Sequence, residues 1–184
     1  MAGGRDYDAR RLEELTVYIA ECSADDPHFG KIKLNKELFF SDFRAFQLTG
    51  QSVTGAVYQH LPMGPAPQQM LPVFGSLKRG KAVRIQGEYT FGGVQERVVP
   101  LRAPDLTLFS GVEIAIVDQV IRELWKLNNS EVSELSHDTM AWRLTHDYQE
   151  IPYGTALLCA EAPSEEDIAW AREVAANRGR LATA

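Results

Sequence analysis

Cysteine is scarce in this sequence: Cys22 and Cys159 are the only two, and neither belongs to a Cys-x-x-Cys pair or a Cys/His cluster. A disulfide framework or a zinc site needs several such residues at short spacings, so we expect neither, and we expect no metal or other cofactor. The apolar runs fall short of the roughly 18 residues that a membrane span requires. The first thirty residues are charged and do not form a secretory signal. These absences favour a protein of the reducing cytoplasm.

The signatures of nucleotide-binding and hydrolytic enzymes are also missing. Neither Gly-x-x-x-x-Gly-Lys-[Ser/Thr] nor Gly-x-Gly-x-x-Gly occurs, so no phosphate-binding loop is encoded. No Gly-x-Ser-x-Gly nucleophile elbow occurs either. We therefore assign no catalytic residue and do not expect an enzyme.

Basic charge is not concentrated enough for a nucleic-acid-binding domain. The net charge is −6 and the isoelectric point is about 5.3. Residues 1–104 carry 13 Lys and Arg against 11 Asp and Glu, whereas residues 105–184 carry 6 against 14. Because nucleic-acid-binding domains usually have a basic face and a high isoelectric point, nucleic acid is not an expected partner.

The chain is long enough for one domain with a substantial core, since it has 184 residues and 45% of them are hydrophobic. Apolar spacing and start and stop signals predict helices over 8–23, 31–49, 130–136 and 165–178. A further helix is predicted from the capping box Ser110-x-x-Glu113 to about residue 128. A strand is predicted over 56–61, a short helix delayed or kinked by Pro72 after it, a hairpin of 82–89 and 94–102 that turns at Gly92-Gly93, and a loop over 142–153. We expect a single α+β domain over 1–184, mainly helical, with a small antiparallel sheet.

Asp42 is unusual because it is a carboxylate within the aromatic run of the predicted central helix. If this helix is buried, the carboxylate needs hydrogen-bond partners, because an isolated charge out of water is costly. The candidates are a tyrosine hydroxyl, backbone amides near Gly55 or Gly64, and His137. A satisfied core aspartate is favoured over an active-site acid.

Glu134 and His137 form the other candidate for chemistry, because they would share a helix face if their helix continued through His137. A carboxylate and an imidazole could act as an oriented base or as two metal ligands. The alternative is that His137 donates to the last free carbonyls of the helix, and this structural role is favoured. For the last predicted helix, which carries Trp170, docking onto the body is favoured over an exposed partner surface.

Two segments are suited to contact a partner protein. A rigid proline-rich loop contains Met63, Gly64, Pro65 and Pro67. A compact basic group contains Lys78, Arg79, Lys81 and Arg84, which could meet an acidic patch, although a solvated turn is the simpler interpretation.

Several short motifs occur in a fixed order between about residues 30 and 145. The first is Leu-Asn-Lys-Glu-Leu-Phe-Phe-Ser-Asp42-Phe. It is followed by Thr-Gly50, Ser-Val-Thr54-Gly55-x-x-Tyr58, Gly64-Pro65-x-Pro67, and Leu-Ser-His137 with Trp142. Together these motifs resemble the Panacea domain, known from phage-associated proteins and SocA-like antitoxins.

The resemblance implies an antitoxin that neutralises a cognate protein toxin by direct binding, and one branch of the family delivers its toxin to an AAA+ protease. It marks Asp42, Gly50, Thr54, Gly55, Tyr58, His137 and Trp142 as family-motif residues with structural roles. The toxin contact is expected at Met63, Gly64, Pro65, Pro67, Lys78, Arg79 and Lys81. Two alternatives remain open: a hydrolase using Glu134, His137 and Asp42, with or without a metal, and a phage or transcriptional regulator.

Overall fold

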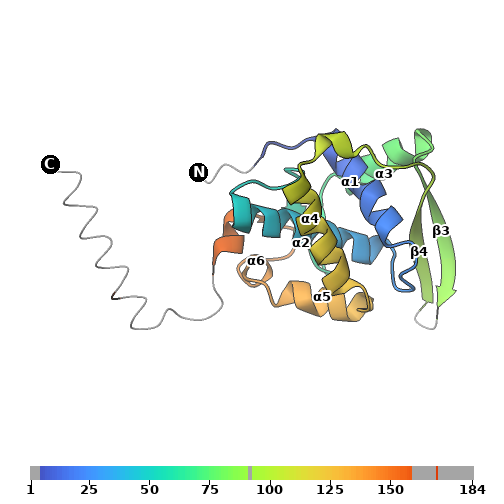
Figure 1. The fold of residues 1–184 in the computed structure, drawn as a ribbon. Coiled ribbons are helices and arrows are strands. Elements are labelled where there is room, and N and C mark those ends of the chain that lie inside the picture. The colour runs from blue at the N-terminus through green and yellow to red at the C-terminus, as the bar shows by residue number, and fades with distance from the viewer. Residues whose placement is uncertain (1–4, 91–92, 159–168, 170–184) are drawn as a thin grey trace.

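A computed structural model gives the fold shown in Figure 1 and describes residues 5–90, 93–158 and 169. The fold is α+β and mainly helical, as predicted. Its helices are α1 (Ala9–Cys22), α2 (Lys31–Thr49), α3 (Met70–Arg79), α4 (Gly111–Leu124), α5 (Asn129–His137) and α6 (Met140–Arg143). Its strands are β1 (Tyr58–Gln59), β2 (Ala66–Pro67), β3 (Val83–Thr90), β4 (Gly93–Pro100) and β5 (Glu150–Ile151), and two 3-10 turns are η1 (Leu106–Leu108) and η2 (Tyr153–Leu157). Cys159, Trp170 and the helix predicted over 165–178 lie outside the described residues, apart from Ala169.

Helix α2 is the central, mostly buried helix that its wide apolar band predicts. It runs through the body with α1, α4 and α5 packed around it (Figure 1). Its side chains Leu34, Leu38 and Phe39 are almost fully buried in the main core. The helix ends at Gly50, whose φ of 75° is left-handed and costs little without a Cβ, and the Gly50 N–H donates to the Phe46 carbonyl.

Capping boxes begin two of the other helices. The predicted box at Ser110 is formed: its hydroxyl accepts from the Glu113 N–H, and the Glu113 carboxylate accepts from the Ser110 N–H. A second box starts α5, with Asn128 as the cap rather than the predicted Asn129. Helix α3 is neither delayed nor broken by Pro72, because Pro72 lies in the first turn, where its missing N–H would have no helical partner.

The predicted hairpin is formed by β3 and β4, which pair antiparallel from Val83 opposite Pro100 to Thr90 opposite Gly93. It extends from one side of the helical body, with β4 facing α1 and α2 (Figure 1). No helix in the described parts of the chain is long and apolar enough to cross a membrane.

A second, three-stranded sheet in the order β2-β1-β5 was not predicted. The strand predicted over 56–61 is limited to β1, and its partner β2 lies inside the proline segment. The prediction of a plain loop over 142–153 is wrong, because this stretch contains the end of α6, strand β5 and the start of η2. Each strand of this sheet has only two residues, so none has a visible period, and the pairing of Tyr58 with Ile151 joins distant parts of the chain.

Candidate functional site

Asp42 is the centre of a fully buried hydrogen-bond cluster between α2 and the segment that follows it. One carboxylate oxygen accepts from the Thr54 N–H at 2.7 Å, and the other accepts from the Thr54 hydroxyl at 2.5 Å and the Tyr58 hydroxyl at 2.8 Å. Burial raises the pKa of Asp42, while these hydrogen bonds oppose the rise. The tyrosine partner is the one that the sequence suggested, but the backbone amide belongs to Thr54 rather than to Gly55 or Gly64, and His137 does not take part.

Gly55, the next residue of this motif, is held in a left-handed conformation with a φ of 71°. A Cβ at this position would lie against the backbone carbonyl oxygens of Arg5 and Asp6. The residue is therefore required both for its φ and for the close approach of the N-terminal segment, which also donates from the Asp8 N–H to the Thr54 carbonyl.

Gly64 makes a similar close approach on the other side of α2. Its φ is 95°, and a Cβ there would lie 2.7 Å from both Lys36 Nζ and Ser136 Oγ. Lys36 is only 2% exposed, and its ammonium donates to the Pro65 carbonyl at 3.3 Å. Desolvation lowers the pKa of Lys36 to about 7. The Gly-Pro motif is thus a packing element over a buried lysine.

His137 and Trp142 belong to an aromatic stack that includes His60. The Trp142 ring lies between the two imidazoles, with centroid distances of 3.3 Å to His60 and 4.2 Å to His137. His60 is fixed further by the Thr145 hydroxyl, 3.0 Å from its Nδ1. Desolvation lowers the pKa of both histidines, and the nearby Lys36 lowers that of His137 further. The role that the structure gives His137 is stacking; within the described residues its buried Nε2 has no hydrogen-bond partner, and no bond to the α5 carbonyls is formed.

The groups considered for hydrolysis are not brought together. Helix α5 does continue through His137, so Glu134 and His137 lie on one helix, but Glu134 is exposed while Asp42 is fully buried and bonded elsewhere. Among the residues that the structure describes, no group of three or more His, Cys, Asp or Glu side chains is placed to hold a metal.

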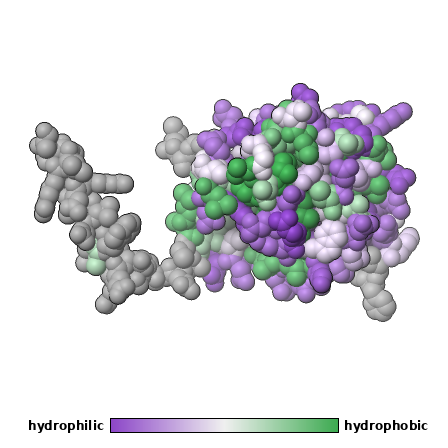
Figure 2. Space-filling model, viewed as in Figure 1, coloured by the Kyte–Doolittle hydropathy of each residue, from purple (hydrophilic) through white to green (hydrophobic). Residues whose placement is uncertain are grey.

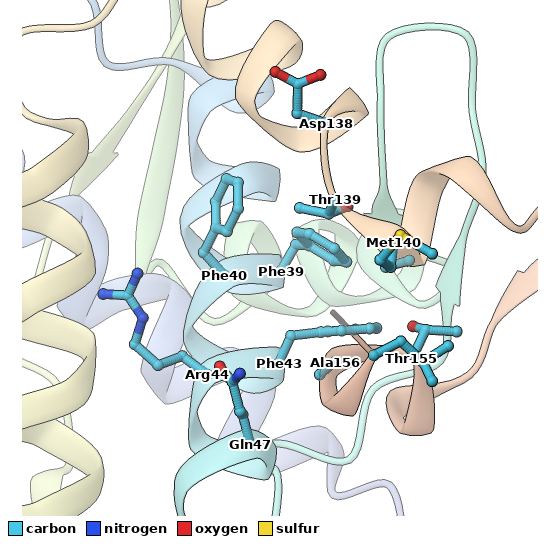
Figure 3. Close-up of a pocket in the computed structure, with 12 residues that line it drawn as sticks. Phe39, Phe40, Phe43, Arg44, Gln47, Asp138, Thr139, Met140, Thr155 and Ala156 are labelled. Carbon is cyan, nitrogen blue, oxygen red and sulfur yellow. The ribbon is translucent and has the colours of Figure 1, made fainter. Parts of the chain in front are cut away.

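A cavity of about 280 Å³ with a mixed polar and apolar lining opens beside α2 (Figure 3). Its aromatic side comes from Phe39, Phe40 and Phe43 of α2, and the turn between α5 and α6 and the 3-10 turn η2 close it. A smaller hollow of about 170 Å³ shares Phe40 and Arg44 with it and leads to α4 and α5. We call the two together the aromatic groove; Leu135 and Leu158, 44% and 51% exposed, lie on its rim.

The groove is the feature that sequence patterns missed. Phe39 and Phe43 belong to the main core and Phe40 is half-buried against it. The opposite wall comes from Thr139, Met140 and η2, about a hundred residues further along the chain. Figure 2 shows that apolar surface on the viewed face of the body is gathered in patches among polar side chains. Only the width of the apolar band on α2 could have indicated that not all of it is covered.

The predicted toxin-contact residues fall on two separate parts of the molecule. In the proline-rich loop, Met63 is 56% exposed, but Gly64, Pro65 and Pro67 are buried. The basic residues Lys78, Arg79 and Lys81 are all exposed, at the end of α3 and just before β3. The contact itself stays a prediction; in the loop, Met63 is the member whose side chain is available without a rearrangement.

Among known families, the chain matches the model described as "Antitoxin SocA-like, Panacea domain" over residues 34–143. This span is more than half of the 184 residues and contains the Asp42 cluster, the Lys36–Gly64 contact and the stack on Trp142. No curated protein and no solved structure matches the chain.

Proposed function

The chain belongs to the SocA-like antitoxin family that is defined by the Panacea domain, and from this premise we propose that it neutralises a cognate protein toxin by binding it directly. The observation that supports this proposal is the aromatic groove. Its aromatic side is formed by α2, the helix with which the family match begins.

The groove suits an apolar anchor of a partner protein. A cavity of about 280 Å³ is at the lower limit of pockets that hold free small-molecule ligands, but it can take a large side chain from a partner's helix or loop. Buried aromatic and apolar anchors supply most of the binding energy in protein interfaces. Asp138 at the edge of the cavity offers a negative charge for orientation, whereas Arg44 is already paired with Glu123 at 2.7 Å.

The exposed members of the predicted contact set would add a polar part to the interface. Lys78, Arg79 and Lys81 form no ion pair with other described residues, so their charges are available to an acidic surface. Opposite charges across an interface raise the association rate more than they raise affinity. Met63 would contribute an exposed apolar contact near α5, because its carbonyl accepts a hydrogen bond from the Ser133 hydroxyl of that helix.

The experiment is co-expression of the chain with the protein encoded beside it, followed by co-purification and a growth-rescue assay. Leu135→Asp and Leu158→Asp should weaken the complex at least tenfold, because a carboxylate on the rim opposes an apolar anchor. Leu106→Asp, at a position that is 39% exposed but outside both the groove and the basic group, is the matched control and should bind normally. Equal loss in all three variants would contradict binding at the groove.

Delivery of the bound toxin to an AAA+ protease is the finer form of this proposal. It would require the same complex plus a contact with the protease. Toxin half-life should then shorten when the antitoxin is present, and only in cells that contain the protease. An unchanged half-life together with full rescue of growth would assign neutralisation to binding alone.

A further inference from the structure

One edge of the β3–β4 hairpin has backbone groups that bond to no other residue in the described part of the chain. The Leu101 N–H donates to the Ala82 carbonyl. These two residues form the pair that comes directly before Val83 and Pro100 in the antiparallel ladder. Hydrogen-bonded pairs alternate along an antiparallel ladder, so Arg84, Gln86 and Glu88 bond to β4. The proline at position 100, opposite Val83, fits this assignment, because it has no N–H to donate.

The backbone N–H and C=O groups of the intervening residues therefore point away from β4. Val83 at the start of β3 is buried, whereas Ile85 is half-buried and Gly87 and Tyr89 are exposed. No hydrogen bond from another described element reaches the backbone of Ile85, Gly87 or Tyr89. From Ile85 to Tyr89, every second residue thus presents both its backbone N–H and its backbone C=O to the outside of the hairpin.

The two edges of the hairpin differ in what covers them. Strand β4 lies against the connection between α1 and α2: a Cβ at Gly30 would lie 3.0 Å from the Glu96 carbonyl oxygen, and the Arg97 guanidinium donates to the Asp26 carbonyl. Strand β3 lies on the outer side of the hairpin and packs against α3 (Figure 1). As far as residues 5–90 and 93–158 show, the β3 edge is therefore the one that is open to another strand.

Apart from the charged side chains of Arg84 and Glu88, this open edge has none of the usual features that prevent strand addition. Natural edge strands are short or carry proline, lysine or a bulge, whereas β3 has eight residues, pairs with β4 in continuous register and contains no proline or lysine. Tyr89 is 93% exposed, a large apolar surface that gains from being covered. A protected edge would be expected if β3 had only a structural role.

The charges next to the edge indicate the chemistry of its occupant. Lys78, Arg79, Lys81 and Arg84 surround the start of β3, and none of them has an ion pair with another described residue. The one acidic residue of the strand, Glu88, is already paired with Arg97 at 3.7 Å. An added strand would therefore be favoured if acidic side chains lay at its end near Arg84.

We propose that β3 binds an extended acidic segment of the toxin by strand addition, with backbone hydrogen bonds to Ile85, Gly87 and Tyr89 and with its acidic end at Lys81 and Arg84. Main-chain bonds would supply affinity, and the basic residues would fix the direction of the strand. This inference rests on the proposed function for the identity of the partner. Of the predicted contact residues, it gives Lys81 a defined role at an interface.

The first test is amide hydrogen exchange. NMR measures the exchange rates in the full chain, alone and in complex with the protein encoded beside it. Complex formation should slow exchange at Ile85, Gly87 and Tyr89 more than tenfold, and exchange at Gln86 and Glu88, which already bond to β4, should change little. A complex that forms without this alternating protection overturns the edge proposal and leaves the proposed function intact.

Variants give an independent readout. Gly87→Pro removes one outward N–H without removing a bond to β4, so the hairpin should persist while affinity for the toxin falls at least tenfold. Lys81→Glu with Arg84→Glu should weaken binding by about tenfold, with a slower association rate. Lys126→Glu, an exposed lysine beyond the end of α4, is the control and should bind as the wild type does. Wild-type affinity in the charge-reversed protein overturns the acidic chemistry.

A peptide probe separates the edge proposal from the proposed function. The peptide acetyl-Glu-Asp-Val-Thr-Val-Thr-Val-amide should perturb the amide signals of Ile85, Gly87 and Tyr89, and its version with alternate N-methylated amides should not, since it cannot form a strand ladder. If the neighbouring protein does not bind but the peptide does, the strand-addition site stands and the toxin is the wrong partner. Protection that rises with the concentration of the chain alone would identify a second copy as the occupant and overturn the proposal.

Discussion

Replacing Asp42 by asparagine tests whether the buried carboxylate holds the fold together. Asparagine has the same shape but only one acceptor oxygen. It can keep the bond from the Thr54 N–H, but its NH₂ group would then face the Thr54 and Tyr58 hydroxyls, which both donate to the carboxylate in the wild type. Both hydroxyl hydrogens would lose their acceptor in a site without exposed surface.

The magnitude follows from these contacts. A hydrogen bond to a charged acceptor contributes about 1.5–3 kcal/mol, and two of the three are lost. The amide recovers part of this, because it removes the cost of burying a charge. We expect Asp42→Asn to lower the free energy of unfolding by about 2–4 kcal/mol at pH 7. Tyr58→Phe removes one of the same bonds and should cost about 1–2 kcal/mol.

The assay is urea unfolding of the wild type, the two single variants and the double variant, with toxin binding measured alongside. The effects should be less than additive, since both variants break the Asp42–Tyr58 bond. Because burial raises the pKa of Asp42 above its usual 3.8, the native state holds the proton more tightly, and wild-type stability relative to Asp42→Asn should fall as pH rises through the folded pKa. A loss below about 0.5 kcal/mol, or intact stability with abolished toxin binding, would refute the structural role.

Three further predictions concern other parts of the fold. Lys36→Met should stabilise the protein by up to about 4 kcal/mol below pH 7, and this gain should shrink toward pH 10.5. The reason is that the pKa of Lys36 is lowered from 10.5 to about 7, so the stability of the wild type rises with pH across this window. Urea unfolding at several pH values measures the difference in stability. Gly55→Ala should lower the midpoint of thermal unfolding clearly more than Gly50→Ala, a matched control with a φ of 75° and no atom within 4 Å of the added Cβ, and equal shifts would contradict the close approach to Arg5 and Asp6. Elemental analysis of chelator-free protein should find no stoichiometric transition metal, whereas one equivalent of zinc or iron per chain would favour a metal-dependent enzyme.

Much of the helical part of the fold could be predicted from the sequence because its signals are local. Apolar residues three and four apart mark α1 and α2, and the box at Ser110 marks the start of α4 within four residues of sequence. The Asp42–Tyr58 bond was anticipated in type, since a carboxylate in an aromatic helix needs a buried donor.

The remaining features depend on contacts between distant residues, which a single sequence does not display. The stack of His60 on Trp142 and the pairing of β1 with β5 join segments more than eighty residues apart. The proline-rich loop was assigned to the surface because proline favours turns, yet Gly64 and Pro65 are buried where they cover Lys36. Nothing local distinguishes a buried lysine from an exposed one, since burial is decided by the elements that pack over it.

The most direct test of toxin neutralisation by binding is co-purification of the chain with the protein encoded beside it, combined with intact-mass measurement of that protein. A stable complex of fixed stoichiometry, in which the toxin is inactive and its mass is unchanged, is the predicted result. A toxin that is inactivated at sub-stoichiometric antitoxin and emerges with an altered mass would show that the chain is an enzyme and would contradict the proposed function.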